Sequence, residues 1–310
     1  MRTPARATPL AFFAERPLFA ATLGAGCIAF SAPLVRLSAA APTTVAVFRC
    51  LYALPVLGVL ARIERVRFGA RTRRAHRLAA VAGIAFAVDL IVWHHAIAAV
   101  GAGLATVLGN MQVVVVALVA WLFLGEPADR RVLGSIPIVV GGVVLVSGVV
   151  GTRAYGKDPV LGVVLGLATS LAYTAFLLVH REGAKDLDRP AGPLFEATLV
   201  TVVVAALYGF VDGSVKLAPA WPSHGWLLAL AMSSQVLGWL LLSISLPRLP
   251  ATLSSVLLLL QPVGSMALGA LIFGENASVV QVAGVVLILV GVWLAARGRA
   301  QDTAPKRAGR

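Results

Sequence analysis

The chain has few charged residues and an unusually large apolar fraction. Only 13% of its 310 residues are charged, about half the share in ordinary globular domains, while 59% are hydrophobic. The mean hydropathy is +0.91. A soluble particle of 32.1 kDa cannot hide that much apolar surface, because much of any folded chain stays exposed. The composition therefore excludes a soluble enzyme, a coiled coil and a disordered protein, and it predicts contact with lipid.

Several chemical motifs are also absent. The two cysteines, Cys27 and Cys50, lie in apolar stretches with neither a metal-ligand spacing nor a disulfide framework. The chain has no Walker loop and no His-Glu-x-x-His motif. Its Gly24-x-Gly26-x-x-Ala29 pattern lacks the βαβ context that dinucleotide binding requires. We therefore expect no metal, no cofactor and no enzymatic activity.

Long apolar runs dominate the chain instead. Each is long enough to cross a bilayer core of about 30 Å and too continuous for the alternating strands of a membrane barrel. Because backbone polar groups in lipid must bond within the chain, we expect an all-α polytopic membrane protein. The ten predicted transmembrane helices are Leu18–Val35, Thr43–Ala61, Leu78–Ala98, Gly103–Leu124, Val132–Val150, Val160–Val179, Leu194–Val211, Trp226–Ser245, Thr252–Phe273 and Val279–Ala296.

The positive charges predict the orientation. The formal net charge is +13, and most of the 26 Lys and Arg lie in alternate connecting segments, above all Arg62–Arg77 and the tail Arg297–Arg310. Such segments stay cytoplasmic, so we expect both termini in the cytoplasm and no nucleic acid as a partner. The excess of Arg over Lys is typical of a bacterial, GC-rich source, which predicts the inner membrane and its lipids as the environment.

A duplication is the clearest internal signal. In each copy an apolar span precedes a Gly-Glu pair and a glycine-containing span follows it, at a shift of 149 or 150 residues. Five spans per copy is an odd number, so the second copy must enter the membrane with reversed polarity. Inverted repeats are a common build for secondary transporters, with the binding site near the midplane between the halves. The matching positions are Gln112, Gly125, Glu126, Gly134 and Gly141 in the first copy, and Gln261, Gly274, Glu275, Gly284 and Gly291 in the second.

These features resemble the ten-helix, EamA-type drug/metabolite transporter superfamily. The stretches Ala102–Gly148 and Ala251–Ala295 carry the resemblance best, and a weaker match extends over residues 18–296. The resemblance implies two five-helix bundles around a central cavity lined by spans one to four and six to nine, with spans five and ten at the periphery. It also implies a small metabolite or drug as substrate, often carried outward. One departure is that Pro262 follows Gln261 whereas Val113 follows Gln112.

The duplication also sets the expected domain boundaries. We expect a cytoplasmic N-terminal segment over 1–17, repeats over 18–151 and 152–296, and a basic cytoplasmic tail over 297–310. A cleaved leader is the alternative for the first span, because Ala39-Ala40-Ala41 fits a cleavage pattern. However, its apolar stretch is longer than a usual leader, Arg36 intervenes, and removal would break the repeat.

Two charged residues lie deep inside predicted spans, where such groups are costly and usually functional. Arg49 and Asp89 lie at roughly matching depths in spans two and three. One interpretation makes Asp89 a proton-coupling or substrate-binding carboxylate, with Arg49 holding an anionic group or tuning Asp89. The other is a buried structural ion pair.

Helical spacing groups further candidates around these two. Trp93 shares a helix face with Asp89, whereas His94 and His95 are offset from it in opposite senses, and His94 is the preferred proton carrier. For each candidate the alternative is a hydrogen bond between helices. Asn110 is expected to be a packing contact, since a continuous helix turns it away from Gln112. The other cavity candidates are Gln112, Thr169, Tyr173, Gln235, Trp239 and Gln261.

Glycines, prolines and the Gly-Glu pairs are expected to shape the helices. Gly125 and Gly274 suit turns, and Glu126 and Glu275 are expected at the N-terminus of the next helix, where negative charge is favourable. Gly162-x-x-x-Gly166 permits close helix contact. Four prolines inside spans are expected to kink their helices and to free backbone carbonyls for a cavity; they are Pro33, Pro55, Pro137 and Pro262.

Together these observations predict a secondary active transporter that exports a small metabolite or drug by proton-coupled alternating access. An uncoupled facilitator or an importer of the same fold is the first alternative, because helix orientation does not decide the direction of flux. A membrane-embedded enzyme or lipid-handling protein is the second, and the absence of another carboxylate near Asp89 argues against it. We expect a small-molecule substrate, protons and membrane lipid as partners, and a monomer or a homodimer.

Overall fold

The computed structural model is all-helical over the residues that it describes. These are residues 9–112, 114–115, 130–146, 156–184, 186–245, 248–249, 257–258 and 260–302. Within them the helices are α1 (Pro9–Glu15), α2 (Pro17–Ala29), α3 (Ser31–Ser38), α4 (Pro42–Phe68), α5 (Arg73–Gly109), α7 (Arg130–Val146), α8 (Pro159–Gly183), α9 (Ala191–Val211), α10 (Ser223–Leu230), η1 (Ala231–Gly238), α11 (Trp239–Ser245), α13 (Leu260–Phe273) and α14 (Val279–Asp302).

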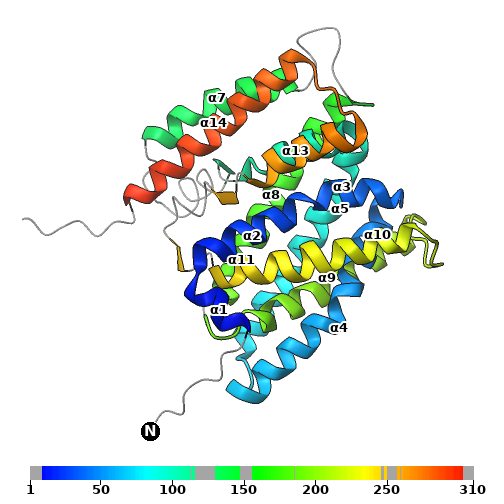
Figure 1. The fold of residues 1–310 in the computed structure, drawn as a ribbon, viewed down its shortest axis with the longest axis vertical. Helices are drawn as coiled ribbons and strands as arrows, with labels where there is room; N and C mark the ends of the chain where they lie inside the picture. The colour runs from blue at the N-terminus through cyan, green and yellow to red at the C-terminus, as the bar shows by residue number, and fades with distance from the viewer. Residues whose placement is uncertain are drawn as a thin grey trace, which may run out of the picture.

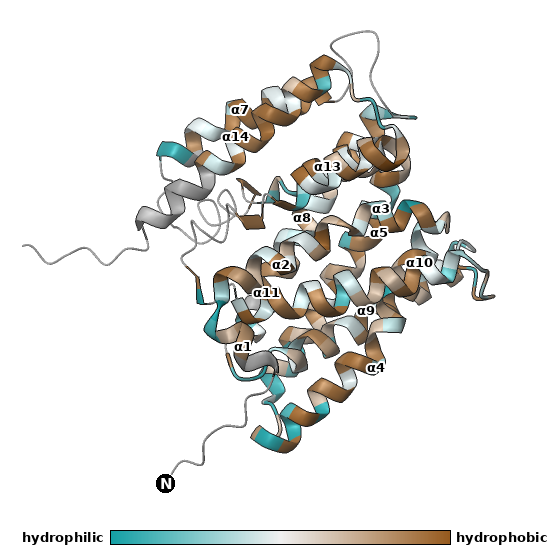
Figure 2. Cartoon of the chain, in the orientation of Figure 1, coloured by the Kyte–Doolittle hydropathy of each residue, from teal (hydrophilic) through white to brown (hydrophobic). Residues whose placement is uncertain are grey.

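The helices are long and apolar enough for a multi-pass membrane protein. Among the described residues, six are at least 18 residues long and apolar enough to cross a bilayer. Three shorter apolar helices, α7, α13 and α14, match predicted spans five, nine and ten. Figure 2 shows apolar residues covering the helices and hydrophilic residues gathering at their ends. Large side chains such as Leu271 (83% exposed) and Val279 (86%) face outward, which suits a lipid environment.

The predicted all-α fold class is confirmed, and two details differ from simple spans. Predicted span three and the described start of predicted span four, as far as Gly109, form α5 as two helical segments that meet at a kink at Gly101, where φ is +84°. Span one is split into α2 and α3 at Phe30. The ring of Pro33 explains the split, because a proline clashes with the carbonyl four residues earlier, here that of Ala29. The predicted boundary between residues 151 and 152 lies outside the described residues and stays a prediction.

Span eight contains a π-helix. One apolar helical stretch runs from Ser223 to Ser245, and its middle, η1, is wound as a π-helix between α10 and α11. Such segments are rare and frequently occur at functional sites. Its consecutive polar residues Ser234 and Gln235 are both fully buried.

Glycines set how closely the helices pack. A Cβ at Gly162 or Gly166 of α8 would come within 2.0 or 2.5 Å of side-chain atoms of Val100 or Leu108 on α5. In the α7–α14 pair, a Cβ at either Gly142 or Gly284 would come within 2.6 Å of the other's carbonyl oxygen. This pair lies along one edge of the molecule (Figure 1), as the resemblance implies for spans five and ten.

The first prediction concerns the α5–α8 contact. Gly166→Ala should lower the free energy of unfolding by about 1–3 kcal/mol, because the new methyl group overpacks against Leu108. The measurement is thermal or denaturant unfolding of the purified protein in detergent. Gly134→Ala on α7 is the matched control, since a Cβ there meets nothing within 4 Å. Equal stability of the two variants would contradict the packing argument.

Candidate functional site

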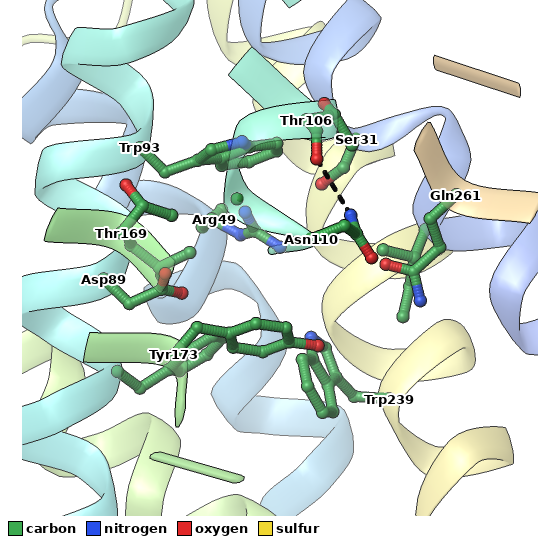
Figure 3. Close-up of a pocket in the computed structure, with 14 residues that line it drawn as sticks. Ser31, Arg49, Asp89, Trp93, Thr106, Asn110, Thr169, Tyr173, Trp239 and Gln261 are labelled. Atoms are coloured by element: carbon green, nitrogen blue, oxygen red, sulfur yellow. Dashed lines mark hydrogen bonds between the residues drawn. The ribbon is translucent and has the colours of Figure 1, made fainter. Parts of the chain in front are cut away.

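A cavity of about 60 Å³ lies among helices from both predicted halves. Its volume suits a few water molecules, which need roughly 10–15 Å³ each, or part of a small ligand. Polar and aromatic side chains form most of its wall (Figure 3). The lining residues are Ile28, Ser31, Arg49, Phe86, Asp89, Leu90, Trp93, Thr106, Gly109, Asn110, Thr169, Tyr173, Trp239 and Gln261.

Arg49 of α4 is a buried charged group of the cavity. Its side chain is 2% exposed, and its Nη2 donates a hydrogen bond to Ser234 Oγ at 3.2 Å. Ser234 Oγ in turn hydrogen-bonds Ser31 Oγ at 3.0 Å. The other two nitrogens, Nε and Nη1, have no partner among the described residues. Ser234 of the π-helix, supported by Ser31 of span one, therefore fixes one nitrogen of the guanidinium, and the other two nitrogens remain available for a ligand.

Asp89 of α5 lines the same cavity and is 6% exposed. Within the described part of the chain no hydrogen bond or ion pair joins its carboxylate to Arg49, since Arg49 Nη2 bonds Ser234 and its Nε and Nη1 have no partner. The geometry thus disfavours the interpretation of the two residues as a closed structural pair. Both charges lie in one cavity, in a region where unpaired charge is expensive.

Aromatic side chains make up a second part of the wall. Tyr173 of α8 and Trp239 of α11 meet edge to face with ring centroids 6.0 Å apart, and Trp239 meets Phe86 in the same way at 5.6 Å. Phe86 also stacks on Phe176 at 4.3 Å. In Figure 3, Trp93 lies on the opposite side of Arg49 from Tyr173 and Trp239. The cavity therefore offers flat apolar surfaces on both sides of its charged groups.

Seven of the ten predicted site residues meet at this cavity, and three lie elsewhere. The seven are Arg49, Asp89, Trp93, Thr169, Tyr173, Trp239 and Gln261. Gln235 faces α9 instead, where its Nε2 donates to Thr198 Oγ1 at 3.2 Å. Gln112 is 2% exposed with an unpartnered Oε1, but it is not among the cavity-lining residues.

His94 lies at a different hollow. It lines a space of about 610 Å³ together with Arg36 and Lys157, beside the kink of α5 at Gly101. Its Nδ1 donates to the carbonyl oxygen of Pro42 at 3.1 Å, because a carbonyl can only accept. The offset between His94 and Asp89 that the helical spacing predicts is therefore present.

The sequence analysis missed three polar cavity residues, and one of them contradicts an expectation. Asn110 was expected to pack away from the site, yet it lines the cavity, as do Ser31 and Thr106. The helical period holds only along a continuous helix, whereas α5 ends at Gly109 and Asn110 is its C-cap. Asn110 Nδ2 donates to Thr106 O at 2.9 Å, the dashed line in Figure 3. The Gly109-Asn110 pair could have indicated this helix end from the sequence, because glycine and asparagine are common where helices end.

Glu275 of the second Gly-Glu pair bonds a helix of the other half. Its carboxylate accepts hydrogen bonds from the backbone N–H groups of Ala102 (2.8 Å) and Gly103 (3.1 Å), directly after the break at Gly101. It also forms an ion pair with Arg36. The carboxylate does sit at a helix N-terminus, but at that of span four rather than that of the next helix, α14. Gly274 has a φ of +62° and ends α13 as a turn, whereas Gly125 and Glu126 lie outside the described residues.

Comparisons with known proteins agree with this architecture. The family model described as the EamA-like transporter family matches the chain twice, over residues 15–148 and 160–297. No curated protein matches it. Among 24 matching chains of solved structures, one described only as a crystal structure of a protein has a TM-score of 0.60 and 16% identity, and the match covers 94% of this chain and 99% of that one. That likeness shows the fold alone, while the double family match confirms the duplicated halves.

The second prediction concerns Glu275. Glu275→Ala should lower the free energy of unfolding by about 2–3 kcal/mol, because two buried N–H groups and Arg36 lose a charged acceptor. Unfolding in detergent measures the change. Glu182→Ala removes the same charge from an exposed pair with Arg74 and should cost about 1 kcal/mol or less. A Glu275→Ala variant no less stable than this control would refute the role of the carboxylate as a tie between the halves.

Proposed function

This chain belongs to the EamA-like transporter family, and we propose that it exports a small metabolite or drug by proton-coupled alternating access. The family membership makes it a multi-pass integral membrane transporter of small molecules rather than an enzyme. The proposal adds the coupling ion, the direction and the residues. It also places the protein in the bacterial inner membrane, as a monomer or homodimer, with both termini in the cytoplasm.

The observation that carries the proposal is the pair of unpaired charges in one cavity. Arg49 and Asp89 are 2% and 6% exposed and line the same space without bonding each other. Ionisable groups at such depth are retained where they bind substrates or relay protons. Asp89 is the carboxylate that takes up and releases the proton, and Arg49 lies where it can hold an anionic group of the substrate.

The position of the cavity supports alternating access. Helices of both halves line it: α4 and α5 from the first, and α8, α11 and α13 from the second. Motion of one half against the other would therefore change the access to Arg49 and Asp89 without dismantling either half. An odd number of spans per half implies opposite orientations, which is a common arrangement in transporters that alternate access by such rocking.

Irregular backbone beside the cavity supports the same mechanism. The break at Phe30 directly precedes the lining residue Ser31, and the π-helix holds Ser234 against Arg49. Interrupted helices free backbone groups and permit bending at a binding site. In this proposal the residues that contact the substrate are Trp93, Tyr173, Trp239 and Gln261. His94 binds and releases protons at the second hollow. Gln112 and Gln235 support the pathway from positions outside the lining of the cavity.

The third prediction tests coupling at Asp89. In cells that express the protein, wild type should confer resistance to at least one compound of a metabolite and toxicant panel, and Asp89→Asn should abolish it. In proteoliposomes, the same variant should lose transport of that compound driven by a pH gradient, because the amide cannot exchange a proton. Unchanged elution and thermal stability in detergent would show that the fold is intact.

Counterflow separates coupled export from its alternatives. Wild type should accumulate the labelled compound by exchange without a pH gradient and respond strongly when a gradient is imposed. Full gradient-driven flux in Asp89→Asn would remove the proton role. Wild-type flux that ignores the gradient would indicate an uncoupled facilitator, and inward accumulation driven by an inward proton gradient would indicate an importer.

A further inference from the structure

We propose that the cavity recognises its substrate through a carboxylate group and excludes substrates that carry only positive charge. This inference rests on the proposed transport function and narrows its substrate class. It follows from the charges that the cavity can carry, from its unused hydrogen-bond donors and from its aromatic wall.

The net charge of the cavity is never negative. Among its described lining residues, Arg49, Asp89 and Tyr173 are the titratable ones. An arginine keeps its proton in a protein, whereas an aspartate can be ionised or protonated. The cavity charge is therefore zero when Asp89 is ionised and +1 when it is protonated, with Tyr173 neutral. A monocation meets no net attraction in the first state and repulsion in the second, at a depth where charges are weakly screened.

The buried unpartnered atoms of the cavity wall are three donor nitrogens and one hydroxyl. Arg49 Nε and Nη1, Gln261 Nε2 and Thr169 Oγ1 are buried without a partner among the described residues. Such donors are costly to leave unpaired, so a ligand that accepts several hydrogen bonds would relieve them. A carboxylate fits, because its two oxygens accept in the plane of a guanidinium. The bond from Arg49 to Ser234 holds the guanidinium in place before the ligand arrives.

The aromatic wall selects the rest of the ligand. Trp93, Tyr173 and Trp239 present ring surfaces to the cavity, and aromatic pairs favour stacked or edge-to-face contacts. The same rings would attract a cation in another setting, but here Arg49 lies among them and opposes it. The ligand class is therefore a small molecule with a carboxylate and a flat apolar body.

Two kinds of ligand share this carboxylate chemistry. The charge of a monoanion balances that of the cavity when Asp89 is protonated and the cavity carries +1. A zwitterion has a net charge that suits the cavity when Asp89 is ionised, because its carboxylate can pair with Arg49 while its ammonium pairs with Asp89. Only the zwitterion competes with the proton for Asp89, so the effect of an Asp89 variant distinguishes the two kinds.

Four probes with one ring and different charges test the proposal. Phenylacetate is an anion, phenylalanine a zwitterion, phenethylamine a cation and phenethyl alcohol neutral at neutral pH. Binding to the full-length protein in detergent is measured by isothermal titration. We expect phenylacetate, phenylalanine or both to bind at least about tenfold more tightly than phenethylamine and phenethyl alcohol, because a hydrogen-bonded charge supplies at least that factor.

Variants assign this preference to Arg49. Arg49→Gln should lose about tenfold or more of the affinity for the carboxylate probe, and Arg49→Lys should recover part of it, because it restores the charge without the planar fork. Arg74→Gln is the matched control, since Arg74 is 78% exposed and lies far from the lining residues in a surface pair. Asp89→Asn should weaken phenylalanine and spare phenylacetate.

Several outcomes would overturn the inference. These are phenethylamine binding as tightly as the carboxylates, no carboxylate binding, or carboxylate affinity that survives Arg49→Gln. If Arg49→Gln fails to fold, the four-probe comparison on wild type and Arg49→Lys still decides the matter. Failure here leaves the proton-coupled transport test of Asp89→Asn intact, since that test uses whichever compound the resistance panel identifies.

Discussion

The rest of the site depends on one constraint: the Arg49 guanidinium lies in an apolar interior and forms few of its possible hydrogen bonds. Arg49 is 2% exposed, and Ser234 is its one hydrogen-bond partner among the described residues. A soluble protein would surround such a group with carboxylates or water, since an uncompensated buried charge is strongly destabilising. Here the nearby carboxylate of Asp89 stays apart from it. The cavity therefore holds two charges whose best partners are absent, which is what a binding site for a charged ligand requires.

The helices around this cavity deviate from regular geometry where they approach it. Pro33 breaks span one just before Ser31, and the π-helix buries Ser234 and Gln235 side by side. Gly101 interrupts α5 where Glu275 bonds across from the second half. Regular helices present one face in a fixed period, so these breaks are what allow polar groups from seven spans to converge.

Much of the fold and part of the site could be predicted from the sequence. Arg49 and Asp89 stand out because charge inside an apolar span is rare, and Trp93, Tyr173, Trp239 and Gln261 follow from helical spacing and the repeat. Two positions differ from the helical period for one reason. Asn110 was assigned by a helical period beyond the point where α5 ends, and Gln235 was assigned by an α-helical period inside a π-helix. Periodicity predicts a face only while the helix type persists.

By itself the sequence determined the membrane class, the helical content, the duplication and the depth of the ionisable residues, because hydropathy, charge placement and spacing are properties of order along the chain. Tertiary structure alone decided that Arg49 bonds Ser234 rather than Asp89, that His94 faces a different hollow, and that Glu275 caps a helix 172 residues away. These are contacts between helices whose rotation and separation depend on glycine packing and backbone breaks. No one-dimensional pattern specifies such distances, since they arise only when the halves pack together.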